Sequence, residues 1–313
     1  MYKKVSVFLI SLIFIFLLTS CGGGKKAKLV ENAKIPDKEL FHTGMDFFNK
    51  GDYEKARLTF QTLMNTYDDS PYLENAKFYI ALSYYKQGGI DNLLLAENGF
   101  KDFKMFFPTS QYTDDAQAYI VDINMRLMRG PTRDLTYTKK AKKELEVFFK
   151  EFPDSPLRKD MERRLVYVDN ILAKSDFEKG KFYYKRKKYK AAAHRFLGCV
   201  KNYKTFFYRD EALFYLARSL EKIRRYNDSA IYYAEIVRGY PFSKYFDAAK
   251  ESLNKLEKPI PPVSEKEAKI NLRYYKMKEK EPNFLIKPFK SFFGIFHHKP
   301  KPWEVKPTTV KNK

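Results

Sequence analysis

The feature that most constrains the fold is a pattern of small residues that recurs along the middle of the chain. Gly44 and Ala81 are 37 residues apart, and so are Gly180 and Ala217. Two aromatic residues follow the small residue in three of the four cases, as in Phe47-Phe48-Asn49-Lys50-Gly51. A period of this length predicts a structural unit that cannot bury its apolar face alone and therefore stacks on its neighbours.

A second helix is predicted in each unit. Apolar residues recur at spacings of four and then three, which places each set on one helix face. The sets are Ala56 and Phe60; Ala96, Phe100 and Phe103; Ala141, Leu145 and Phe148; Ala192 and Phe196; and Tyr233 and Ile236. Serines such as Ser70, Ser110 and Ser155 lie between the units, where they are expected to cap the next helix. Five units are predicted, the third with a long loop around Gly130 and the fourth beginning with an extended helix.

These units resemble tetratricopeptide repeats. The resemblance implies an all-α fold for residues 37–257, with about five tetratricopeptide-type helical hairpins in a right-handed superhelix and small residues where two helices approach closely. In such repeats the first helices line the concave side. The inward positions of the first two repeats are Phe41, Met45, Phe48, Phe78, Leu82 and Tyr85. We expect an apolar groove that binds an extended peptide, although aromatic residues at these positions also occur for packing alone.

The N-terminus predicts export and lipid attachment. Lys3 and Lys4 precede an apolar run that is shorter than a membrane-spanning helix, so residues 1–20 are interpreted as a signal peptide. Leu18-Thr19-Ser20-Cys21 resembles the lipobox of bacterial lipoproteins, which implies a covalent lipid on Cys21 and further acylation, for example with palmitate, after cleavage. The alternative is an ordinary signal peptide with a chance cysteine. Residues 21–36 are predicted to be a flexible tether, and Gly22 favours the outer membrane over the inner.

The combination of lipobox, five repeats and particular segments resembles the BamD family of lipoproteins. The segments include Arg163-Arg164-Leu165-Val166-Tyr167-Val168 and Tyr183-Tyr184-Lys185-Arg186, whereas Tyr203-Lys204 departs from the usual Tyr-Pro of the family. The resemblance implies a lipid-anchored scaffold on the periplasmic face of the outer membrane of a Gram-negative bacterium. Its implied partners are a BamA-like barrel subunit and nascent outer membrane β-barrel proteins. Arg195 matches a family position near the docking surface, with a solvated arginine as the alternative. A repeat lipoprotein that coordinates peptidoglycan or division enzymes is the alternative function.

The C-terminal residues 258–313 are interpreted as a basic, proline-rich tail. They carry 14 Lys/Arg against 5 Asp/Glu, and Pro259-Ile260-Pro261-Pro262 is expected to end the preceding helix. An apolar stripe predicts a short amphipathic helix that lies in a membrane interface, docks on a partner, or folds back on the repeats; it comprises Leu285, Phe289, Phe292, Phe293 and Phe296.

No catalytic or nucleic-acid-binding pattern accompanies the net charge of +22. The four histidines lack the spacing of metal ligands, and no phosphate-binding glycine loop is present. Cys199 is predicted to be a buried packing thiol. The sequence therefore predicts a protein that is not an enzyme, with no metal, no nucleic acid and no cofactor beyond the lipid on Cys21.

Overall fold

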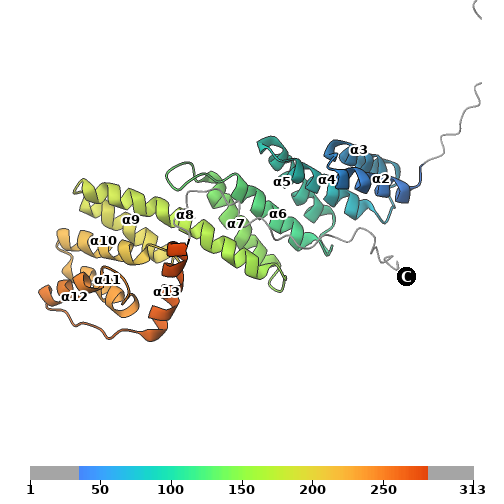
Figure 1. Ribbon diagram of the computed structural model, residues 1–313. Coiled ribbons are helices and arrows are strands. Elements are labelled where there is room, and N and C mark those ends of the chain that lie inside the picture. Colours follow the sequence, from blue (N-terminus) through green and yellow to red (C-terminus); the bar gives the residue numbers. More distant parts are fainter. Residues whose placement is uncertain (1–34, 281–313) are drawn as a thin grey trace, which may run out of the picture.

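The computed structural model describes residues 35–280, and every regular element in this range is an α-helix. The helices form five hairpins that follow one another along an elongated array (Figure 1), as predicted for tetratricopeptide-type repeats. The pairs are α2 (Asp37–Lys50) with α3 (Tyr53–Thr66), α4 (Leu73–Gln87) with α5 (Ile90–Phe106), α6 (Thr113–Arg126) with α7 (Thr136–Glu151), α8 (Arg158–Lys185) with α9 (Tyr189–Asn202), and α10 (Arg209–Lys222) with α11 (Tyr226–Gly239). Two further helices, α12 (Phe246–Lys255) and α13 (Glu265–Lys280), follow them.

The small residues allow the two helices of a hairpin to approach closely, as the sequence predicts. A Cβ atom at Gly44 would lie 2.5 Å from the Phe60 ring, and one at Gly180 would lie 2.6 Å from the Phe196 ring. Neither distance is possible for a real Cβ atom. The first and fourth hairpins therefore use the same glycine–phenylalanine contact to set the distance between their helices.

The serines between hairpins make two hydrogen bonds each. The hydroxyl of Ser70 accepts from the backbone N–H of Tyr72 at 3.2 Å, and it donates to the carboxylate of Asp37 at 2.7 Å. Ser243 repeats this arrangement with Tyr245 and with Asp210. Ser110 and Ser155 do the same with their own backbone and acidic partners. Each linker thus ties the start of one hairpin to the start of the previous one.

The linker after the fourth hairpin lacks this serine, and Asn170 of α8 replaces it. The Asn170 side chain donates to the carbonyl oxygen of Thr205 at 3.2 Å and accepts from the N–H of Phe207 at 2.9 Å. An asparagine on the extended helix thus fixes from outside the linker that follows Tyr203-Lys204.

Four of the turns inside the hairpins contain a residue with a positive φ at the same position. The residue seven positions after the small residue has a positive φ in four hairpins: Gly51 (83°), Gly88 (72°), Lys187 (59°) and Arg224 (62°). In the first, fourth and fifth hairpins its N–H bonds to the carbonyl three residues earlier, and the next N–H bonds to the carbonyl five residues earlier. This pair of bonds ends the first helix in the same way each time.

Helix α8 connects the N-terminal and C-terminal halves of the array. Its 28 residues make it the longest described helix, as expected from the extended segment after Pro156. Its first half packs with α6 and α7 through Met161, Val168 and Ile171. Its second half belongs to the C-terminal core through Ala173 and Phe177. Two packed regions therefore share one continuous helix.

The helix α13 was not predicted, because the sequence analysis placed the end of the array at residue 257. The prolines do end α12, but the chain then returns to α11. The N–H of Ser264 donates to the carbonyl oxygen of Arg238 at 2.8 Å, and the Asn271 side chain donates to that of Gly239 at 3.0 Å. The docking is largely polar, so the hydrophobic pattern of the segment did not reveal it.

Candidate functional site

The predicted peptide groove is not an open surface. Phe41, Met45, Phe78, Leu82 and Tyr85 are all buried, and Phe48 is half-buried. The Phe41 ring stacks on Tyr72 of the next linker at 4.9 Å between centroids, and Phe78 packs edge-on against Phe100 at 5.4 Å. The prediction of an open groove is therefore wrong for the five buried side chains, because rings such as Phe41 and Phe78 fill the space between their own second helix and the following hairpin. For Phe48, which is half-buried, it stays a prediction.

Tyr85 belongs instead to a buried polar network. Its hydroxyl donates to the Asp122 carboxylate at 2.6 Å, and the Arg126 guanidinium lies over its ring at 4.1 Å. The fully buried Arg164 of α8 pairs with Asp122 at 2.6 Å and with Asp160 at 2.8 Å. Burial alone would lower the pKa of Arg164, but the two carboxylates outweigh it and raise that pKa, so the guanidinium stays charged.

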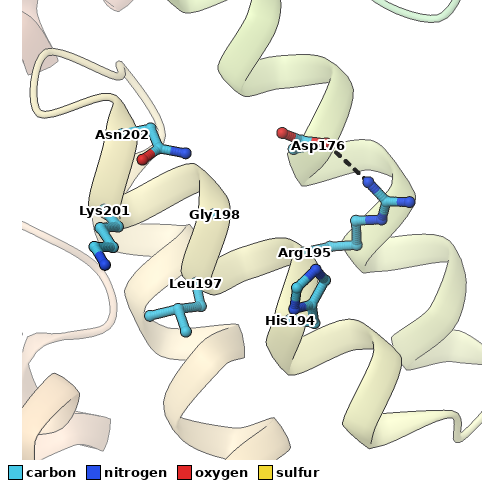
Figure 2. Close-up of a pocket in the computed structure, with 7 residues that line it drawn as sticks. All are labelled: Asp176, His194, Arg195, Leu197, Gly198, Lys201 and Asn202. Carbon is cyan, nitrogen blue, oxygen red and sulfur yellow. Dashed lines mark hydrogen bonds and ion pairs between the residues drawn. The ribbon is translucent and has the colours of Figure 1, made fainter.

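The accessible candidate site lies around Arg195, between α8 and α9. Figure 2 shows the side chains of Arg195 and Asp176 pointing toward each other. Both line a depression of about 420 Å³. Their ion pair is long, at 3.4 Å, and both side chains are partly exposed. An exposed pair of this kind contributes little stability, so Arg195 can exchange Asp176 for another carboxylate at small cost. The depression is lined by Asp176, His194, Arg195, Leu197, Gly198, Lys201 and Asn202.

A second depression of about 490 Å³ adjoins the first and shares Asn202 with it. Lysines of α7 line one side, and Leu172 and Tyr203 line the other. Lys142 pairs with Asp169 at 2.9 Å and lies 5.1 Å from the centre of the Tyr203 ring. Burial and the nearby Asp176 raise the pKa of Tyr203 to about 12. Together the two depressions, which we call the Arg195 surface, offer positive charge around an apolar floor.

Of the residues that line this surface, only Arg195 was predicted from the sequence as a partner contact, and that role stays a prediction. The run Lys139-Lys140-Ala141-Lys142-Lys143 was an available signal. Only the fold shows that α7 brings these lysines beside the end of α9. Cys21 and the tail residues Leu285, Phe289, Phe292, Phe293 and Phe296 lie outside the described residues.

Other candidate chemistry is limited in the described part of the chain. Cys199 is buried, as predicted, with its thiol 3.5 Å from the carbonyl oxygen of Ala173, and burial raises its pKa. Residues 35–280 contain no group of three or more His, Cys, Asp or Glu side chains arranged to hold a metal ion. Within the same range, no helix has the length and apolarity needed to cross a bilayer.

Comparison with known proteins gives one family and a consistent set of relatives. The family model described as YfiO, outer membrane lipoprotein, matches residues 33–229. The outer membrane protein assembly factor BamD of Pasteurella multocida is 27% identical over 248 residues, which cover 75% of this chain and 91% of the relative. The proteins of the same name from Haemophilus influenzae (27% identical; 66% and 80% covered) and Rickettsia prowazekii (25% identical; 73% and 90% covered) also match.

A solved structure, the TPR2AB domain of yeast Sti1 in complex with pHSP90, aligns with 79% of this chain and 92% of its own. Its TM-score is 0.36 at 13% identity, a likeness that carries no argument about function.

Proposed function

Because this chain belongs to the YfiO family of outer membrane lipoproteins, we propose that it is an outer membrane protein assembly factor that acts as a scaffold and not as an enzyme. The observation that carries the proposal is the family match over residues 33–229, which span the first four hairpins and α10, together with relatives that are themselves named assembly factors. A stack of helical hairpins with exposed charged depressions suits the binding of other proteins.

The proposed location is the periplasmic face of the outer membrane, with a lipid on Cys21 as the anchor. Residues 21–36 would then connect the anchor to the first hairpin, which begins at Asp37. Several acyl chains on one residue give stable membrane attachment without a membrane-spanning helix.

The proposed docking site for a BamA-like barrel subunit is the Arg195 surface. To bind a partner, the guanidinium of Arg195 has to give up its long ion pair with Asp176. The apolar side chain of Leu197 is exposed beside it. Interfaces of moderate affinity combine such a central arginine with an apolar floor and a charged rim. The lysines of α7 supply that rim and favour a partner surface that carries carboxylates.

Nascent outer membrane proteins are the second proposed class of partner. The burial of Phe41 and Phe78 means that this contact uses other side chains, and that replacing those two rings would disturb packing first. Among the six residues predicted to line the groove, Phe48 alone keeps a half-buried side chain that a client can reach.

Co-purification from detergent-solubilised outer membranes tests the proposal. The lipidated chain is expected to retain a large barrel protein, and Arg195→Glu is expected to reduce its recovery at least tenfold, because reversing a central charge places like charges together. Arg158→Glu, which reverses an exposed arginine at the start of α8, is the matched control and should leave recovery unchanged.

Unchanged recovery with Arg195→Glu would move the docking site elsewhere. Failure of the unsubstituted chain to retain any barrel protein would contradict the proposed function itself. Far-ultraviolet circular dichroism of each variant confirms that the helices remain intact.

A further inference from the structure

The fourth hairpin carries a concentration of positive charge, of which only Arg195 and Lys201 line the Arg195 surface. Residues 179–209 contain eleven Lys/Arg and no Asp or Glu. Four of these, Lys185, Arg186, Lys187 and Lys188, form the turn between α8 and α9, and all four are exposed. Within residues 35–280, none of the four forms an ion pair with a carboxylate. The turn therefore presents uncompensated charge to solvent.

The backbone conformation of this turn also supports a binding role. Lys187 and Arg224 occupy the positive-φ position at which the first two hairpins have Gly51 and Gly88. A side chain is disfavoured in this conformation, whereas glycine adopts it freely. Departures from a local preference of this kind concentrate where a protein binds something. Two hairpins thus keep a basic residue where glycine would be more stable.

Exposed aromatic residues accompany the charge. Phe182 is 52% exposed, with the Arg186 guanidinium 3.7 Å from its ring centre, and Tyr226 at the start of α11 is 47% exposed. The first helices of stacked hairpins run in the same direction, so the turns after α8 and α10 lie on one edge of the array (Figure 1). We call this strip the basic edge: Phe182, Lys185, Arg186, Lys187, Lys188, Lys222, Arg224 and Tyr226.

We propose that the basic edge binds the anionic headgroups of a lipid bilayer, as a second membrane contact of this chain. Lysine and arginine beside exposed aromatic rings are the combination that membrane interfaces attract. All residues of the basic edge are exposed, and none of them lines either depression of the Arg195 surface. A bilayer is a flat charged surface that can contact all of the protruding side chains at once, whereas a protein partner needs a surface shaped to match them. The proposal rests on the proposed function only in placing the chain near an outer membrane.

Vesicle flotation with the purified mature chain tests this contact. Cys21→Ser removes the lipid anchor, and the tail is retained. The chain is expected to float with phosphatidylcholine vesicles that contain about 30% phosphatidylglycerol, and to lose binding as salt rises because screening weakens the attraction. Each basic residue near such a surface contributes about fivefold in partitioning. Changing Lys185, Arg186, Lys187 and Lys188 to Gln should therefore weaken binding at least tenfold.

The matched control changes four exposed lysines that lie outside both the basic edge and the Arg195 surface, Lys50, Lys86, Lys140 and Lys150, to Gln, which removes the same charge. It should weaken binding less than twofold. Equal losses in the two variants would show diffuse attraction and overturn the proposal, as would full binding by the turn variant or flotation with pure phosphatidylcholine. No barrel subunit is present in this assay, so its failure leaves the co-purification result intact, and the reverse also holds.

Discussion

The first two hairpins and the last two are built on the same framework but present opposite charge. Residues 35–112 carry eleven Asp/Glu and eight Lys/Arg, whereas residues 179–245 carry five and seventeen. The internal contacts hardly differ: Gly44 meets Phe60 as Gly180 meets Phe196, and Ser70 bonds to Asp37 as Ser243 bonds to Asp210. The comparison shows that two repeats can keep the same internal packing while the charges on their surfaces differ.

The turns show the same division in backbone terms. The N-terminal hairpins place glycine at the positive-φ position, and the C-terminal ones place Lys187 and Arg224 there. The N-terminal region thus follows the local preference, and the C-terminal region departs from it in favour of charge. The N-terminal turns therefore favour stability, whereas the C-terminal turns give up some stability for surface charge.

The largest expected effect concerns the joint between the two regions. Arg164→Ala should lower the free energy of unfolding by about 3–5 kcal/mol, because it leaves Asp122 and Asp160 buried without their shared cation. Chemical denaturation followed by circular dichroism measures the loss. Arg163→Ala removes a half-exposed neighbour that pairs only with Asp160, and it should cost less than about 1 kcal/mol. Similar losses in the two variants would mean that the buried network does not couple the regions.

A smaller expected effect is a pH dependence of stability that arises in α6, between the two compared regions. Burial and the neighbouring Asp114 raise the pKa of Asp115 on α6 from 3.8 to about 7. The folded state therefore holds this proton more tightly than the unfolded state does, and stability is lost as the pH rises from about 4 to about 7. Asp115→Asn removes the charge and should raise the free energy of unfolding by about 1–2 kcal/mol at pH 8.

Near pH 4 the same substitution should have almost no effect, because the carboxyl is already protonated in the folded protein. Denaturation curves at the two pH values give the comparison. Asp46→Asn, at an exposed position of α2, is the control and should change stability equally at both. A pH-independent gain for Asp115→Asn would show that the side chain acts through packing and not through its charge.

The smallest expected effect comes from exchanging the turn residues of the two regions. Gly51→Lys should destabilise the chain by about 1 kcal/mol, and Lys187→Gly should stabilise it by a similar amount, since only glycine tolerates positive φ without cost. Thermal unfolding measures both. The same sign for the two exchanges would contradict the strain assigned to Lys187.

The repeats could be predicted from the sequence because the residues that define them lie close together along the chain. Gly44 and Gly180 stand at a fixed sequence distance from the phenylalanines they meet, and Ser70 accepts a hydrogen bond from the N–H of Tyr72, two residues away. It failed for Phe41 and Phe78, because a position on the inner side of a helix does not reveal whether the next hairpin covers it. The bonds between Ser70 and Asp37, and the docking of α13, join residues about thirty positions apart and leave no local pattern.

The length of α8 sets the distance between two features that it carries. At 28 residues the helix spans about 42 Å. Arg164 and Asp176 lie on it about 18 Å apart, at a rise of about 1.5 Å per residue. The buried arginine of the polar network and one wall of the Arg195 surface therefore belong to a single hydrogen-bonded helix, with no loop between them.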